Sequence, residues 1–279
     1  MKILFITDLH GTKSKYKKVH DIAKAENVNM VINGGDMLPT HPNFFIQDEF
    51  IQSFLDEYLN DFDREKIYYL GMAGNDDLIT FDDLLIQTFE KYSYTEYIAQ
   101  RWVKIGQFEF IGMNFITDLP FGLKDRARID NDDFEFPKQI GKQLISSNGE
   151  IKEIKDWFAY ARNLPTIEEE LENLPEPENY RKTIYIFHMP PSNISLDVCS
   201  DASRVGSKAI FEFIKKRQPL FTLHGHIHES VSMSGKWYNK IGNTISIQPG
   251  QGDYHKKILD YVIVNLKTMT FERIETIID

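Results

Sequence analysis

The chain has 279 residues and a formal net charge of −10, with 42% hydrophobic and 27% charged residues. These proportions are normal for a globular protein, and the length suffices for one large domain with a substantial core. The acidic balance disfavours nonspecific binding to nucleic acid or to anionic membranes, because both rely on basic surfaces.

A strand, a helix and a second strand open the chain. The stretch "KILFITD" (2–8) is rich in β-forming residues, and "NMVINGGD" (29–36) is a second apolar run that ends in glycines. Between them, residues 14–27 carry apolar side chains at helical spacing. This order within about thirty residues is typical of a βαβ unit, so we expect two adjacent parallel strands.

The next elements continue the alternation. Residues 44–60 predict an amphipathic helix, 66–74 a third strand and 81–91 a further helix. Residues 101–114 read as two β segments around Gly106-Gln107, which predicts a hairpin.

The middle of the chain, residues 118–180, is polar and interrupted by prolines. It contains the acidic runs "TIEEELENL" and "PEPEN", which we interpret as a solvated face, and a helix is expected over 153–164. We interpret 118–180 as an insertion of helices and loops within a single domain that covers residues 1–279.

The β pattern returns after this region. We expect strands at 182–191 and 219–230 with a helix at 207–217 between them. Residues 231–250 and 258–274 alternate with period two, as antiparallel strands with one solvated face do.

Five polar turns follow apolar strands. They are Asp8-Leu9-His10, Gly35-Asp36, Gly74-Asn75-Asp76-Asp77, His188 and Gly225-His226-Ile227-His228. The carboxyl ends of parallel strands form one rim where ligand sites lie, so turns that are distant in sequence can converge there. Each turn alone is weak evidence, but five in order indicate a common site. Asp, His and Asn side chains suit divalent metals such as Mn, Fe, Zn or Co.

Cysteine content and apolar run lengths indicate the compartment. Cys199 is the one cysteine, so no intrachain disulfide can form, and no cysteine is available for a structural zinc site. No apolar run is long enough for a transmembrane helix, and the N-terminal residues do not read as a signal peptide. We therefore expect a cytoplasmic protein without a membrane partner.

The five turns together resemble the motifs of the calcineurin-like metallophosphoesterase superfamily. The stretch from "HMPPSNISLD" to "LFTLHGHIHES" also looks like a group of small bacterial and archaeal phosphoesterases within it. The resemblance implies a four-layer α/β/β/α sandwich of two mixed sheets, the metallo-dependent phosphatase-like fold. It also implies a dinuclear metal site, with manganese favoured.

Carried over by motif position, the resemblance assigns seven metal ligands. Asp8, His10 and His228 would hold one ion, Asn75, His188 and His226 the other, and Asp36 would bridge both. The implied reaction is hydrolysis of a phosphate monoester, diester or pyrophosphate of a small molecule by a metal-bound hydroxide, with Asn75 offsetting charge on the phosphoryl oxygens.

The chain departs from the family pattern at Asp76, where the motif usually has a histidine. A carboxylate beside two cations favours its charged form and is a poor general acid near neutral pH. Either Asp76 has a catalytic role, orienting a water or a substrate group, or it is a turn carboxylate and another residue acts. Asp77 matches the closing acid of the motif and would orient a ligand or cap the next helix.

Other polar residues have weaker assignments. We expect His224 to be structural or to support a ligand, and His20, His41 and His255 to have no role, although His41 follows Asp36 closely enough to lie near the site. Arg126, Arg128 and Arg204 could grip a substrate phosphate, but salt bridging is the more ordinary role for an arginine. An alternative to the enzyme is a catalytically weak, metal-binding scaffold or regulatory protein of the same fold.

Overall fold

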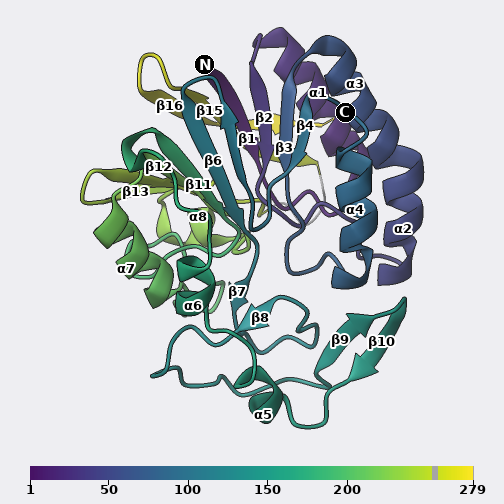
Figure 1. Cartoon of the computed structure of the whole chain (residues 1–279), viewed down its shortest axis with the longest axis vertical. Coiled ribbons are helices and arrows are strands. Elements are labelled where there is room, and N and C mark those ends of the chain that lie inside the picture. The colour runs from purple at the N-terminus through teal and green to yellow at the C-terminus, as the bar shows by residue number, and fades with distance from the viewer. Residues whose placement is uncertain (253–256, 279) are drawn as a thin grey trace.

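The computed structural model describes residues 1–252 and 257–278. Two six-stranded mixed sheets lie face to face, and helices cover their outer faces (Figure 1). The expected four-layer α/β/β/α architecture is thus confirmed. In the part of the chain that the structure describes, no helix is both long and apolar enough to span a membrane. The cytoplasmic location stays a prediction.

The first sheet has the strand order β16-β15-β1-β2-β3-β4. Its strands are β1 (Lys2–Ile6), β2 (Met30–Asn33), β3 (Tyr68–Gly71), β4 (Thr95–Tyr97), β15 (Ile258–Asn265) and β16 (Thr270–Ile277). Strands β1 to β4 pair in parallel, and β15 pairs antiparallel with both β1 and β16. The βαβ prediction is therefore confirmed, with Ile3 of β1 opposite Met30 of β2.

The second sheet has the order β13-β14-β12-β11-β6-β5. Its strands are β5 (Trp102–Ile105), β6 (Phe108–Met113), β11 (Thr183–Phe187), β12 (Phe221–Leu223), β13 (Tyr238–Ile241) and β14 (Thr244–Ile247). Strands β5 and β6 form the expected hairpin around Gly106-Gln107. Residues 231–234, expected to be extended, instead belong to helix α8 (Ser230–Ser234), which ends at the left-handed Gly235.

Helices α1 (Lys13–Ala25), α2 (Gln47–Phe50), α3 (Asp56–Glu65) and α4 (Asp82–Phe89) cover the first sheet (Figure 1). A π-helical turn over Ile51–Leu55 joins α2 to α3. Helix α7 (Lys208–Arg217) covers the second sheet (Figure 1). Alternating side chains of the strands explain the layers, since Phe110 packs between the sheets while Ile111 packs on the α7 side.

The segment 118–180 lies beyond the carboxyl ends of the central strands (Figure 1). It carries β8 (Ala127–Arg128), which pairs with β7 (Ile116–Thr117), and the hairpin of β9 (Leu144–Ser147) and β10 (Glu150–Glu153). The hairpin was not expected, and it confines the helix predicted at 153–164 to α5 (Trp157–Ala161), whose first turn the Asp156 side chain caps. Helix α6 (Ile167–Glu172) follows and buries Ile167 and Leu171 in the core beside α7. That 1–279 is one domain with this insertion stays a prediction.

Candidate metal centre

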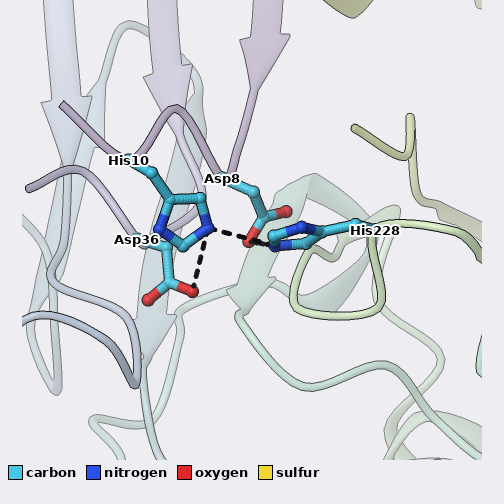
Figure 2. Close-up of side chains that lie close together, drawn as sticks. All are labelled: Asp8, His10, Asp36 and His228. Atoms are coloured by element: carbon cyan, nitrogen blue, oxygen red, sulfur yellow. Dashed lines mark hydrogen bonds and ion pairs between the residues drawn. The ribbon is translucent and has the colours of Figure 1, made fainter. Parts of the chain in front are cut away.

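Four of the seven predicted ligands meet at the carboxyl end of the first sheet. Asp8, His10, Asp36 and His228 each offer one ligand atom, and these atoms all lie within 4.8 Å of one another (Figure 2). The Nε2 atoms of His10 and His228 face each other at 3.1 Å. The Asp36 carboxylate lies 3.7 Å from His10 Nε2, and the Asp8 carboxylate lies 3.6 Å from His228 Nε2.

The other three predicted ligands form a second group beside the first. His188 Nδ1 donates to the Gly34 carbonyl at 2.9 Å, which leaves Nε2 directed at Asn75 Oδ1, 3.0 Å away. The His226 ring lies next to the His188 ring, with 5.3 Å between centroids. Asp36 Oδ2 lies 3.5 Å from His188 Nε2, so the same carboxylate also borders this group.

The backbone at this rim is bent sharply. Asp8, His10, Asp36 and His226 all have positive φ angles between 44° and 71°, which L-residues with side chains seldom adopt. Such strain persists only where the surrounding structure enforces it, and it gathers at functional sites. Gly35 is required here, because a Cβ at its φ of 119° would collide with the His188 ring. A Cβ at Gly74 would collide with Asp36.

The protonation of the histidines follows from burial and from the two carboxylates. Burial lowers the pKa of His226 to about 3, and it lowers that of His10 to about 4. Burial opposes charge on His188 as well, but Asp36, Asp8 and the Gly34 carbonyl together outweigh it and raise the pKa of His188 to about 9. Burial likewise opposes ionisation of Asp36, yet His188 keeps the pKa of that carboxyl below its ordinary value. A bound cation would take the place of the proton on His188.

Asp76 lines the cleft above the four-residue group. Its carboxylate accepts from Asn75 Nδ2 at 3.0 Å and lies 3.8 Å from His10 Nδ1, while its N–H donates to Asp36 Oδ1 at 2.8 Å. Burial and the negative charges of Asp36 and Asp77 raise the pKa of Asp76 to about 7. A bound divalent cation would act in the opposite direction.

Asp77 fastens the two loops that carry Asp36 and Asn75. Its carboxylate accepts from the N–H groups of Met37, Leu38 and Gly74 at 2.8–2.9 Å. It caps no helix, since the 3₁₀ turn that follows spans Ile79–Phe81, has Leu78 as its N-cap residue and receives no side-chain cap. Of the two expected roles, the geometry therefore favours orienting a ligand-bearing loop.

His224 supports the backbone around His188. Its buried ring donates from Nδ1 to the carbonyls of Phe187 and Met189, and its Nε2 lies 2.8 Å from the Thr222 hydroxyl. Burial lowers the pKa of His224 to about 3, so the ring stays neutral.

Two glutamines that no sequence motif predicts also hold the backbone of the ligand-bearing loops in place. Gln47 bonds through its amide to the Asp76 carbonyl and the Leu78 N–H, and Gln248 donates to the carbonyls of Gly225 and Ile227. Both are buried glutamines in otherwise ordinary segments, so only the fold reveals their partners.

The three arginines have structural partners. Arg126 is buried, donates to the Gly74 carbonyl and forms an ion pair with Asp82. Arg128 pairs with Glu170, and the exposed Arg204 lies 3.8 Å from Asp197. Of the two roles expected for these arginines, phosphate binding and salt bridging, the contacts favour salt bridging.

The remaining histidines differ in position. His20 Nε2 lies 3.2 Å from Glu65, and His255 lies outside the described residues. His41 lines the cleft at the four-residue group, as its closeness to Asp36 in sequence had allowed.

The family model of the calcineurin-like phosphoesterases matches residues 1–230. The chain therefore belongs to this family of metallophosphoesterases, which hydrolyse phosphoric esters and for which divalent metal ions are the implied cofactors. The resemblance drawn from the five turns is confirmed. No curated protein matches the sequence.

Solved structures share the fold. The protein TT1561 of Thermus thermophilus superposes with a TM-score of 0.60 at 12% identity, covering 100% of this chain and 99% of that chain. A dimetal phosphatase from Danio rerio gives a TM-score of 0.54 at 11% identity, again covering 100% of this chain and 99% of that chain. At these identities the likeness establishes the fold and leaves the substrate open.

Proposed function

We propose that the chain hydrolyses a small phosphate monoester, diester or pyrophosphate with two divalent metal ions at the strand ends. The observation that carries the proposal is the position of Asp36. Its Oδ2 lies 3.7 Å from His10 Nε2 and 3.5 Å from His188 Nε2, so one carboxylate borders both ligand groups. A carboxylate that borders two sets of ligand atoms suits a bridging ligand.

The donor atoms fit cations. Within the described part of the chain, the Nε2 atom of His226 is buried without a hydrogen-bond partner, although buried polar atoms normally have one. His188 Nε2 and Asn75 Oδ1 also face each other at 3.0 Å, and both offer lone pairs when the imidazole is neutral. A cation bound between them would give His226 Nε2, His188 Nε2 and Asn75 Oδ1 a partner for their lone pairs.

In this proposal Asp8, His10 and His228 hold one ion, Asn75, His188 and His226 hold the other, and Asp36 contacts both. When bound, two such ions activate a water and neutralise charge on the transferred phosphoryl group. Asn75, which is held by Asp76, offsets charge on the equatorial oxygens, and Asp76 orients the attacking water or the substrate.

The test begins with the metal content of the purified protein, measured by elemental analysis. Turnover is then measured on p-nitrophenyl phosphate and on bis-p-nitrophenyl phosphate with added Mn²⁺, Zn²⁺, Co²⁺ or Fe²⁺. We expect two ions per chain and turnover of at least one substrate, with manganese the most effective. Stoichiometric metal without turnover would support the scaffold alternative, whereas one ion per chain would contradict the dinuclear site.

A further inference from the structure

The loop that carries His41 is fastened to the loop that carries Asp76. Asp77 holds its first residues, since the Asp77 carboxylate accepts from two backbone N–H groups of this loop at 2.8–2.9 Å. Gln47, which follows the loop in α2, donates from its buried amide to the Pro39 carbonyl at 3.2 Å and to the Asp76 carbonyl at 2.8 Å. The two loops therefore form one wall of the cleft, with His41 and Asp76 both lining it.

His41 lies at the mouth of this cleft. It is exposed, whereas the ligand Asp8, which lines the same cavity of about 320 Å³, is buried. In an in-line displacement the leaving group departs on the side opposite the attacking water. The proposed function places that water at the buried ligands, so the leaving group points toward the mouth, where His41 lies.

The oxygen that leaves phosphorus needs a proton, because an alkoxide is a strong base. Among the described residues that line the cleft, His10 and His228 would use their lone pairs as ligands. Asp76 beside two cations favours its charged form. A lysine ammonium or a threonine hydroxyl is ordinarily a far weaker acid than an imidazolium. His41 is the remaining imidazole, and histidine is the side chain that most often exchanges protons in catalysis near neutral pH.

We propose that His41 is the catalytic acid that protonates the leaving group. The oxygen of water forms its bond to phosphorus while the bond to the leaving oxygen breaks and leaves its electron pair on that oxygen. The His41 imidazolium gives its proton to this oxygen. The proton that the attacking water loses passes to solvent, and His41 takes up another from solvent before the next turnover.

This inference rests on the proposed function, and it separates the work of two neighbouring residues. Asp76 orients the water or the substrate, while His41 supplies the proton. The substrate class then includes esters of ordinary alcohols, whose alkoxides leave readily only when they are protonated.

The test compares two esters that differ in how much the leaving oxygen needs a proton. Phenyl phosphate and p-nitrophenyl phosphate form one pair, and methyl phenyl phosphate and methyl p-nitrophenyl phosphate form the corresponding diester pair. We expect His41→Gln to lower kcat on the phenyl ester by at least about 100-fold, the loss typical of a general acid. The nitrophenolate is stable as an anion, so kcat on the nitrophenyl ester should change by less than about 3-fold.

His20→Gln is the matched control, because His20 faces Glu65 in α1 and does not line the cleft. It should leave both rates unchanged. Equal losses on the two esters in His41→Gln, or no loss, would overturn the role of His41 while leaving the hydrolase standing. Absence of wild-type turnover on every ester would instead contradict the hydrolase, and the proton donor with it.

A second readout does not depend on turnover. Inorganic phosphate is titrated into the Zn²⁺-loaded wild type, and NMR follows the Cε1–H signal of His41, assigned by its loss in His41→Gln or His41→Asn. We expect this signal to shift on saturation with phosphate, because the ring contacts a phosphoryl oxygen, while the His20 signal stays in place. A His41 signal that does not respond to bound phosphate would also overturn the inference.

Discussion

Asp36 is the residue on which both ligand groups depend. It is buried, borders His10 on one side and His188 on the other, and accepts the Asp76 N–H. A side chain in this position must be charged to hold two cations, because an amide of the same shape supplies oxygen without the charge.

We expect Asp36→Asn to lower metal affinity by more than about 100-fold, beyond the loss typical of residues that only support a ligand. Elemental analysis after dialysis measures the change. Asp77→Asn is the control, with an expected loss of about 10- to 100-fold, because Asp77 supports the ligand loops without facing the ions. Two ions per chain retained in Asp36→Asn would rule out the bridging role.

Asp76 is expected to act on the reaction and not on metal retention. Asp76→Asn keeps an oxygen that can accept from Asn75 but removes the carboxylate from the cleft. We expect kcat to fall by about 100-fold, as for the loss of a positioned polar group, with unchanged metal content. Steady-state kinetics on each active substrate decides the matter. An unchanged kcat on all of them would mean that Asp76 is a turn carboxylate and that another residue acts.

At the scale of elements, the loop that carries Asn75 is fixed by the segment 118–180. Arg126, just before β8, donates to the Gly74 carbonyl and pairs with Asp82 at the start of α4. The segment is thus tied to the site through one buried guanidinium, in addition to lying beyond the strand ends (Figure 1).

We expect Arg126→Ala to reduce the free energy of unfolding by about 3 kcal/mol, because it leaves the Gly74 carbonyl and the Asp82 carboxylate without their partner. Denaturation with urea at saturating metal measures the loss. Arg204→Ala removes an arginine whose side chain is 55% exposed and should cost less than about 1 kcal/mol. A similar loss in both variants would show that Arg126 is not a structural clamp.

At the scale of the molecule, both sheets and five loops contribute ligands to the proposed metal centre, so metal binding should stabilise the whole fold. Ions that bind only the folded state add about 2.7 kcal/mol when free metal is 100 times the dissociation constant. Bound ions also offset the repulsion between the negative charges of Asp8 and Asp36, which lie in one cluster.

We therefore expect a chelator to lower the melting temperature of the wild type and excess Mn²⁺ to restore it, as measured by differential scanning calorimetry. Asp36→Asn should melt at the same temperature with and without the chelator. A wild-type melting temperature that does not respond to chelation would contradict a metal centre shared by the two sheets.

Much of the fold could be predicted because its signals are local. Apolar runs such as 2–8 and 29–36 and the helical spacing of Tyr16 and Val19 in α1 hardly depend on distant residues. The β9–β10 hairpin was missed, because five of its eight residues are polar and only Ser146 is fully buried, so the two strands show no regular alternation of apolar residues.

The sequence by itself determined the five turns, their order after strands and the family, since glycines and ligand types at strand ends are readable residue by residue. Only the tertiary structure decided how the residues of different turns are placed relative to one another. Asp36 stands between His10 and His188, Asp77 ties two loops together, and the buried Lys15 reaches the cleft. These relations join residues up to 236 positions apart, as Lys15 and Gln251 are, and such pairings arise only when the strands assemble into sheets.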